Sequence, residues 1–148
     1  MKVIDGLIYD TIGFTCSCFD LLHAGHIIML QYAKARCDKL IVGLQTDPTI
    51  DRPDTKNKPI QSLEERRIQL EAIKYVDEIH TYDSEKDLYE LLKKLNPDVR
   101  ILGSDYIGKS FTGDDLDIKI YYHDRSHNYS TTNLREKIES EKNKSKSD

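Results

Sequence analysis

The sequence predicts a single α/β domain, built on a Rossmann-like, mostly parallel five-stranded sheet with helices on both faces. The main observation is an alternation along the chain between short apolar segments and segments whose apolar residues recur with helical spacing. Strands and helices that alternate in this way form parallel sheets, because each crossover helix returns the chain to the same edge. The length of 148 residues fits one domain, which we expect to span residues 1–138.

The five predicted strands are short runs rich in apolar and β-prone residues. They cover residues 12–19, 39–45, 77–81, 99–103 and 118–122. Four helices are predicted between or after these strands, at residues 24–37, 62–76, 84–95 and from 130 or 131 onward. Ser62 and Glu65 form a capping box at the second helix, and Asn96-Pro97 ends the third. The lysine- and serine-rich residues 139–148 are expected to form a disordered polar tail.

The composition excludes several classes of protein. The net charge of −4 does not suit a nucleic-acid surface, so nucleic acid is not an expected partner. No apolar run approaches the roughly 18 residues of a membrane span, so no membrane insertion is expected. Three cysteines and a start unlike a secretory signal favour a cytoplasmic location over a disulfide framework. Cys16 and Cys18 alternate on a strand without a second pair, so they predict no metal site.

The ligand site of such a sheet is expected beyond the carboxyl ends of its strands. The end of the first strand, the loops 46–61 and 103–117 and the segment 125–132 then share one rim. The first of these loops is long and carries three prolines. Long loops in compact domains are commonly functional, so this loop is a candidate part of the site.

Two histidines, His23 and His26, lie three residues apart where the first helix begins. At a helix N-terminus the backbone N–H groups point outward and the helix dipole is positive, which favours phosphate. Gly25 lets a phosphate approach the backbone closely. Imidazoles donate hydrogen bonds that strengthen as negative charge develops on phosphate oxygens. The pattern favours phosphate chemistry over metal binding; one capping and one buried histidine is the alternative interpretation.

A second candidate phosphate site lies near the C-terminus. Ser130 and Thr131 are good N-cap residues, so a second helix N-terminus is expected at the same rim. Their hydroxyls and free amides would bind a triphosphate, and Arg125 would supply a planar positive group. Helix capping alone is the alternative role for this segment.

Three motifs resemble the cytidylyltransferases of the H-x-G-H nucleotidyltransferase superfamily, most closely the glycerol-3-phosphate cytidylyltransferases. Residues 19–26 read Phe-Asp-Leu-Leu-His-Ala-Gly-His and carry the H-x-G-H signature. Residues 125–132 resemble the family's R-T-E-G-I-S-T-T motif, with the arginine and Ser-Thr-Thr retained and the four residues between them changed. Residues 103–109 resemble its G-D-D-W-x-G-K stretch. The similarity covers most of the chain, from about residue 13 to residue 134.

The resemblance implies transfer of CMP from CTP to a small phosphorylated alcohol, by a homodimer that releases pyrophosphate. Mg²⁺ is expected with the triphosphate because of its charge, and no metal-ligating residues are predicted. The implied catalytic residues are His23, His26, Lys56, Lys58 and Arg125, with one of the two loop lysines bridging the phosphates of the substrates. The implied nucleotide-binding residues are Cys18, Phe19, Gly25, His26, Lys74, Asp105, Arg125, Tyr129, Ser130, Thr131 and Thr132.

Departures from the family pattern leave the base and the acceptor open. Ser17 and Cys18 replace the usual glycine and threonine, and Lys74 stands in place of an arginine. The third helix starts with acidic residues, whereas the glycerol-phosphate enzymes have a lysine-rich start. Arg66 falls where the family also has an arginine, and we expect it to pair with a neighbouring glutamate.

Two other functions are compatible with these residues. Residues 57–60, 97–99 and 103–106 resemble adenylyltransferases of the heptose-1-phosphate type, which would use ATP. A non-catalytic nucleotide-binding regulator on the same fold is the third interpretation. It is the least favoured, because both histidines and the Ser-Thr-Thr hydroxyls are retained.

Overall fold

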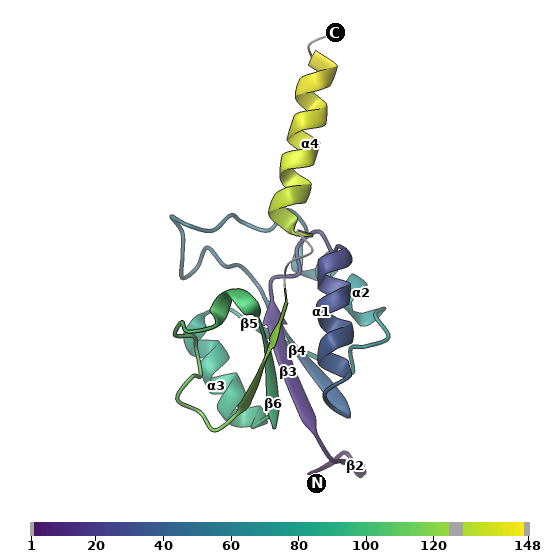
Figure 1. Cartoon of the computed structure of the whole chain (residues 1–148), viewed down its shortest axis with the longest axis vertical. Helices are drawn as coiled ribbons and strands as arrows, with labels where there is room; N and C mark the ends of the chain where they lie inside the picture. Colours follow the sequence, from purple (N-terminus) through teal and green to yellow (C-terminus); the bar gives the residue numbers. More distant parts are fainter. Residues whose placement is uncertain (1, 125–128, 147–148) are drawn as a thin grey trace.

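The computed structural model describes residues 2–124 and 129–146 and contains a five-stranded parallel sheet with helices on both faces (Figure 1). The strands are β3 (Ile12–Ser17), β4 (Lys39–Gln45), β5 (Glu78–Tyr82), β6 (Val99–Gly103) and β7 (Lys119–His123). Their order across the sheet is β5-β4-β3-β6-β7. The chain winds outward from β3 in one direction and then crosses to β6, so the switch point lies between these two strands. The predicted fold class is confirmed.

Four helices alternate with the strands, as the sequence predicts. They are α1 (Ala24–Lys34), α2 (Leu63–Glu71), α3 (Glu85–Leu95) and α4 (Thr131–Lys146). The hydroxyls of Ser62 and Ser84 accept hydrogen bonds of 3.1 Å from backbone amides in the first turns of α2 and α3. Asn96 ends α3 in the left-handed conformation, with φ of 46°, and Pro97 follows it. These caps explain why the starts of α2 and α3 and the end of α3 agree with the prediction, whereas α1 and α2 end earlier than predicted, at Lys34 and Glu71.

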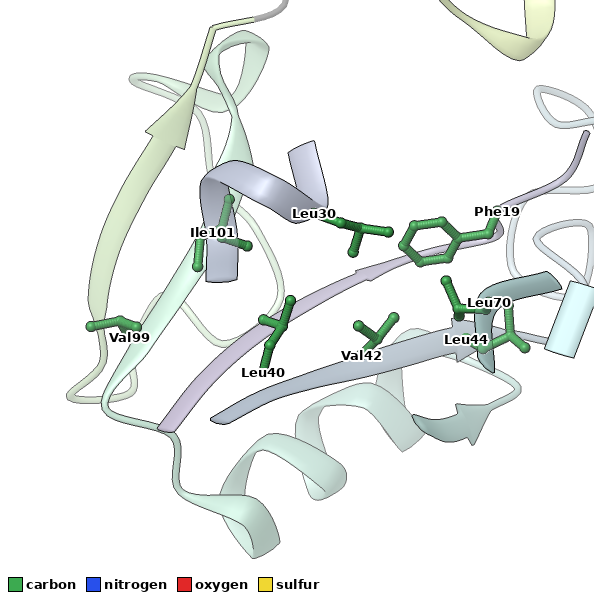
Figure 2. Close-up of a cluster of buried hydrophobic side chains, with 9 residues drawn as sticks. Phe19, Leu30, Leu40, Val42, Leu44, Leu70, Val99 and Ile101 are labelled. Carbon is green, nitrogen blue, oxygen red and sulfur yellow. The ribbon is translucent and has the colours of Figure 1, made fainter. Parts of the chain in front are cut away.

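One half of the hydrophobic core lies between the sheet and the pair α1 and α2. Leu40, Val42 and Leu44 alternate along β4 and all face this side. Leu30 of α1 and Leu70 of α2 pack against them. Figure 2 shows Leu40, Val42 and Leu44 spaced along β4, with Leu70 and Leu44 beside Phe19. This packing fixes the start of α1 over the carboxyl end of the sheet.

The other half of the core lies between the sheet and α3. Leu88 and Leu92 lie on one face of α3, four residues apart, and pack on Phe14 of β3 and Ile41 of β4. Residues of β4 thus enter both halves of the core, so both faces of this strand are buried, which accounts for the nearly continuous apolar run of residues 40–44.

An N-terminal hairpin of β1 (Lys2–Ile4) and β2 (Leu7–Tyr9) precedes the sheet and was not among the predicted elements. Its turn is Asp5-Gly6, with positive φ angles of 51° and 80°. An Asp-Gly pair between two short apolar runs is the typical signal of such a hairpin, because both turn positions need left-handed backbone. The signal was present in the sequence but was not used.

The last helix, α4, projects from the carboxyl end of the sheet (yellow in Figure 1). The sequence predicts disorder from residue 139, whereas α4 continues as one helix to Lys146. Its glutamates and lysines lose little rotamer freedom in a helix, and Lys144 pairs with Glu141 one turn earlier at 3.5 Å. The polar segment is therefore corrected to a helical extension through residue 146. The domain boundary at residue 138 stays a prediction.

Candidate active site

The turn between β3 and α1 has an uncommon backbone conformation. Phe19 and Leu21 have positive φ angles of 52° and 50°, which cost on the order of 1–3 kcal/mol each for residues with a side chain. Asp20 lies between them, and its buried carboxylate accepts hydrogen bonds of 2.9 Å from the backbone amides of Ile60 and Gln61. The Leu21 amide donates to the side-chain oxygen of Gln61 at 2.9 Å. These contacts hold the turn and set the direction in which α1 begins.

His23 and His26 form a reciprocal cap at the N-terminus of α1. His23 is the N-cap, and its Nδ1 accepts a hydrogen bond of 3.0 Å from the Gly25 amide. Nδ1 of His26 accepts one of 3.2 Å from the His23 amide, and the two rings stack with centroids 3.8 Å apart. Because each Nδ1 is an acceptor, each neutral imidazole carries its proton on Nε2. The pair thus presents two Nε2–H donors at a helix N-terminus, which suits phosphate oxygens.

The capping role and the phosphate-binding role of the histidines are compatible in this geometry. The capping role is confirmed, and it is performed by the Nδ1 atoms of both rings. The cap fixes the tautomer in which Nε2 is the donor, so the structural role prepares the chemical one.

Gly25 leaves no room for a side chain. A Cβ atom at this position would lie 2.8 Å from the carbonyl oxygen of Tyr129 and 2.8 Å from Cε1 of His23. The glycine is thus required where the segment before α4 packs against α1, in addition to the phosphate approach that the sequence predicts for it.

Replacing Gly25 with alanine is expected to destabilise the protein by about 1–3 kcal/mol, because backbone on one side and a capping ring on the other must move. We also expect turnover to fall, since the ring that moves is His23. Urea unfolding and steady-state rates measure the two effects. Ala24→Ser, which adds one atom at the exposed neighbouring position, is the control; equal behaviour of the two variants would contradict the packing role.

α4 begins against the turn that carries the histidines. Ser130 caps α4, its hydroxyl accepting a 3.0 Å hydrogen bond from the Asn133 amide. The hydroxyl of Thr131 donates to the backbone carbonyl of Asp20 at 2.8 Å. The two predicted phosphate segments therefore meet at one rim, although they are far apart in the sequence (Figure 1). Arg125 lies outside the described residues, so its role stays a prediction.

The remaining candidates of the rim, Thr132, Tyr129 and Asp105, are exposed. Thr132 and Tyr129 flank the α4 cap. Asp105 lies in the 3-10 turn Ser104–Tyr106 directly after β6. The structure therefore places all three at the carboxyl end of the sheet, as predicted, and their roles as nucleotide contacts stay predictions.

The long loop returns to the rim beside the histidines. Lys56 and Lys58 are both exposed, and the ammonium of Lys58 lies 3.8 Å from the carboxylate of Asp47. Hydrogen bonds from the side chain and amide of Thr49 lower the pKa of Asp47, and Lys58 adds a smaller effect in the same direction. Asp47 is therefore a carboxylate near neutral pH and a counter-ion for Lys58. The bridging of phosphates by Lys56 or Lys58 stays a prediction.

Lys74 does not lie at this rim, which corrects the prediction from the resemblance. α2 starts at the rim and runs back along the sheet, so residues after its end lie at the amino end of the strands. The amide of Asp77, three residues after Lys74, donates to the carbonyl of Leu40 at the start of β4 at 3.0 Å. Lys74 occupies the position of the family's arginine in the sequence, but the direction of α2 separates it from the histidines of the same chain.

Phe19 is buried and Cys18 is bound by Arg66, so few atoms of either residue can contact a ligand. The side chain of Phe19 is 1% exposed and belongs to the core, so only its backbone is available. The carbonyl of Cys18 accepts a hydrogen bond from Arg66 at 2.9 Å. Burial raises the pKa of the Cys18 thiol, so a thiolate is not favoured. The roles of both residues in nucleotide binding stay predictions.

Arg66 has a different role from the predicted glutamate pair. Its guanidinium is buried and donates to four backbone carbonyls. These belong to Cys18 at 2.9 Å, Gln45 at 2.6 Å, Thr46 at 2.7 Å and Gln61 at 3.2 Å. The side chain therefore ties the ends of β3 and β4 to both ends of the long loop. A motif alone could not distinguish this arrangement from an ion pair.

Two further residues of the rim, Asp20 and Arg135, were not singled out by the sequence analysis. Asp20 accepts hydrogen bonds from the loop amides, and Arg135 of α4 pairs with it at 3.0 Å. The available signal for Asp20 was its position in the otherwise apolar stretch Phe-Asp-Leu-Leu. A carboxylate in such a stretch is buried only when it has hydrogen-bond or ionic partners. Arg135 carried no comparable signal.

Two features are absent from residues 2–124 and 129–146. No helix there is both long and apolar enough to cross a bilayer. No group of three or more histidine, cysteine, aspartate or glutamate side chains comes together there to hold a metal ion.

Comparison with known proteins identifies similar sequences over most of the chain. A family model described as "Cytidylyltransferase-like" matches residues 14–137. The bifunctional protein HldE of Caulobacter vibrioides is 39% identical over 127 residues, which cover 83% of this chain and 26% of that protein. HldE of Wolinella succinogenes is 46% identical over 105 residues, covering 71% and 22%, and that of Helicobacter pylori is 36% identical over 137 residues, covering 93% and 30%. The chain thus spans about a quarter of the length of these relatives.

Solved structures share the same architecture. A lipopolysaccharide core biosynthesis protein from Thermoplasma volcanium superposes with a TM-score of 0.58 at 25% identity, covering 74% of this chain and 93% of that one. Pantothenate synthetase from Thermus thermophilus superposes with a TM-score of 0.64 at 14% identity, covering 84% and 61%. The second likeness concerns the fold alone.

Proposed function

Because the chain belongs to the cytidylyltransferase-like family of nucleotidyltransferases, we propose that it transfers AMP from ATP to a sugar phosphate, such as a heptose 1-phosphate. The histidine pair at the N-terminus of α1 is the observation that carries the transfer reaction. The choice of ATP is supported by the HldE relatives, which fit the resemblance to heptose-1-phosphate adenylyltransferases better than the one to glycerol-3-phosphate enzymes.

The proposed reaction is an in-line displacement at the α-phosphorus. An oxygen of the acceptor phosphate forms the new P–O bond, and the bond from the α-phosphorus to the oxygen that bridges to the β-phosphate breaks. That oxygen keeps the electron pair and leaves with pyrophosphate. A phosphate dianion is already nucleophilic, so no general base is needed, and catalysis comes from positioning and charge neutralisation.

Each part of the rim has a role in this proposal. The Nε2–H groups of His23 and His26 donate to phosphate oxygens as charge develops on them. Ser130 and Thr131 start a second helix N-terminus that faces the triphosphate, and Lys56 or Lys58 bridges the two substrates. Mg²⁺ enters with the triphosphate as a counter-ion of the substrate. Assembly as a homodimer and a cytoplasmic location stay predictions.

CTP with a small phosphorylated alcohol is the second candidate. It is supported by the Phe-Asp-Leu-Leu-His segment and by the description of the matching family model. The acidic start of α3, with Glu85 and Asp87 in its first turn, weighs against it, since the glycerol-phosphate enzymes carry lysines there.

A screen of pyrophosphate release distinguishes these candidates. We expect ATP with a sugar 1-phosphate to give a kcat/KM at least about tenfold above any pairing with CTP, because a base pocket discriminates by hydrogen bonds. The panel contains ATP and CTP, each with heptose 1-phosphate, other sugar 1-phosphates and glycerol 3-phosphate. Faster release from CTP and glycerol 3-phosphate would contradict the ATP proposal. Nucleotide binding without release from any pair would favour a non-catalytic regulator.

A further inference from the structure

A buried carboxylate joins α4 to the long loop. Asp20 is 5% exposed, and its Oδ2 accepts a hydrogen bond from Nη2 of Arg135 at 3.0 Å. The same oxygen accepts one from the Ile60 amide at 2.9 Å. Nη2 of Arg135 also lies 3.4 Å from the carbonyl oxygen of Lys58. One arginine therefore contacts both the turn that leads to His23 and the backbone of the loop.

We propose that Arg135 is a positioning residue that couples the N-terminal turn of α4 to the loop carrying Lys56 and Lys58. The inference rests on the proposed function, in which this loop supplies the lysine that bridges the phosphates. Arg135 acts through the loop backbone and does not itself touch a substrate.

The coupling follows from where Arg135 lies on α4. It is four residues after Thr131, so the two side chains share a face of the helix. Thr131 donates to the carbonyl of Asp20, and Arg135 pairs with the carboxylate of the same residue. A nucleotide that holds the first turn of α4 therefore also holds Arg135, and with it the loop at Lys58.

The chemistry of the guanidinium makes arginine the suitable residue here. One nitrogen, Nη2, makes both contacts, and the rigid guanidinium plane fixes the directions of its two N–H groups, whereas an ammonium rotates at the end of a flexible stem. Arg135→Lys is thus expected to keep the ion pair with Asp20 and to lose the contact with Lys58. Arg135→Gln removes the positive charge and, because glutamine is shorter, the contacts with Asp20 and with the carbonyl of Lys58.

Limited proteolysis of the full chain tests the contact without any need for activity. Arg52 and Lys58 each precede a proline, so Lys56–Asn57 is the trypsin-sensitive bond of this loop. We expect cleavage at this bond to be about fivefold faster in Arg135→Gln than in the wild type, because the loop opens more often. ATP is expected to slow this cleavage in the wild type and much less in the variant. Lys137→Gln, which removes a charge from an exposed position of the same helix, is the control.

Steady-state kinetics then test the positioning role. We expect Arg135→Gln to raise the KM for the acceptor phosphate or lower kcat by about tenfold, with the KM for the nucleotide within about twofold of wild type. Arg135→Lys should recover part of the loss. Equal cleavage rates in Arg135→Gln and Lys137→Gln, or equal losses in both KM values, would overturn the coupling. A cleavage difference with no transfer activity in the wild type would overturn the proposed function and leave the contact standing.

Discussion

Replacing His26 with alanine is expected to lower kcat by about 100-fold or more, which is the usual cost of removing one donor that faces developing negative charge. The variant also loses the Nδ1 atom that accepts from the His23 amide, at a cost of about 1 kcal/mol to the helix cap. Rates of product formation at saturating nucleotide measure the first effect, and urea unfolding measures the second.

His26→Asn separates these two contributions. The asparagine oxygen occupies nearly the position of Nδ1, so it retains an acceptor for the cap and removes only the Nε2–H donor. We expect a free energy of unfolding close to that of the wild type and a kcat as low as that of His26→Ala. His80→Asn on β5 is the matched control for a histidine outside the rim. Wild-type turnover in His26→Asn would show that the histidine is only a cap.

Arg66→Ala is expected to lower the free energy of unfolding by about 3 kcal/mol or more. The reason is that one buried guanidinium satisfies four backbone carbonyls, and hydrogen bonds to a charged donor contribute about 1.5–3 kcal/mol each. Activity should fall as well, because the turn before the histidines and the long loop lose their common anchor. Equilibrium urea unfolding gives the stability.

The neighbouring arginine provides the comparison for this variant. Arg67 is more exposed than Arg66 and differs from it by one position on the same helix, so Arg67→Ala removes the same charge without the carbonyl contacts. We expect a change within about 0.5 kcal/mol for Arg67→Ala. Similar losses in the two variants would contradict the anchoring role of Arg66.

The fold was predictable because its signals are local. Alternating apolar runs and serine caps at Ser62 and Ser84 determine the elements, and the parallel order follows from their alternation. The histidine pair was predictable for the same reason, since three residues of spacing place both rings at one helix start. The Asp5-Gly6 hairpin was equally local and was overlooked.

The remaining parts of the site depend on contacts between distant segments. Arg66 reaches carbonyls about 20 and 48 residues away, and the Asp20–Arg135 pair joins residues 115 apart in the chain. No periodicity or spacing predicts such pairs. The placement of Lys74 shows the reverse error, because a position that corresponds to a family residue in the sequence does not say at which end of the sheet it lies.

Transfer of the α-phosphorus label from ATP to the acceptor tests the central claim most directly. The full chain is incubated with α-³²P-ATP, Mg²⁺ and heptose 1-phosphate, and the label is followed into a nucleotide-linked sugar product. The account predicts a labelled product that forms with the wild type and is reduced about 100-fold or more with His26→Asn. ATP bound at the rim without any labelled product, or equal labelling by both chains, would contradict it.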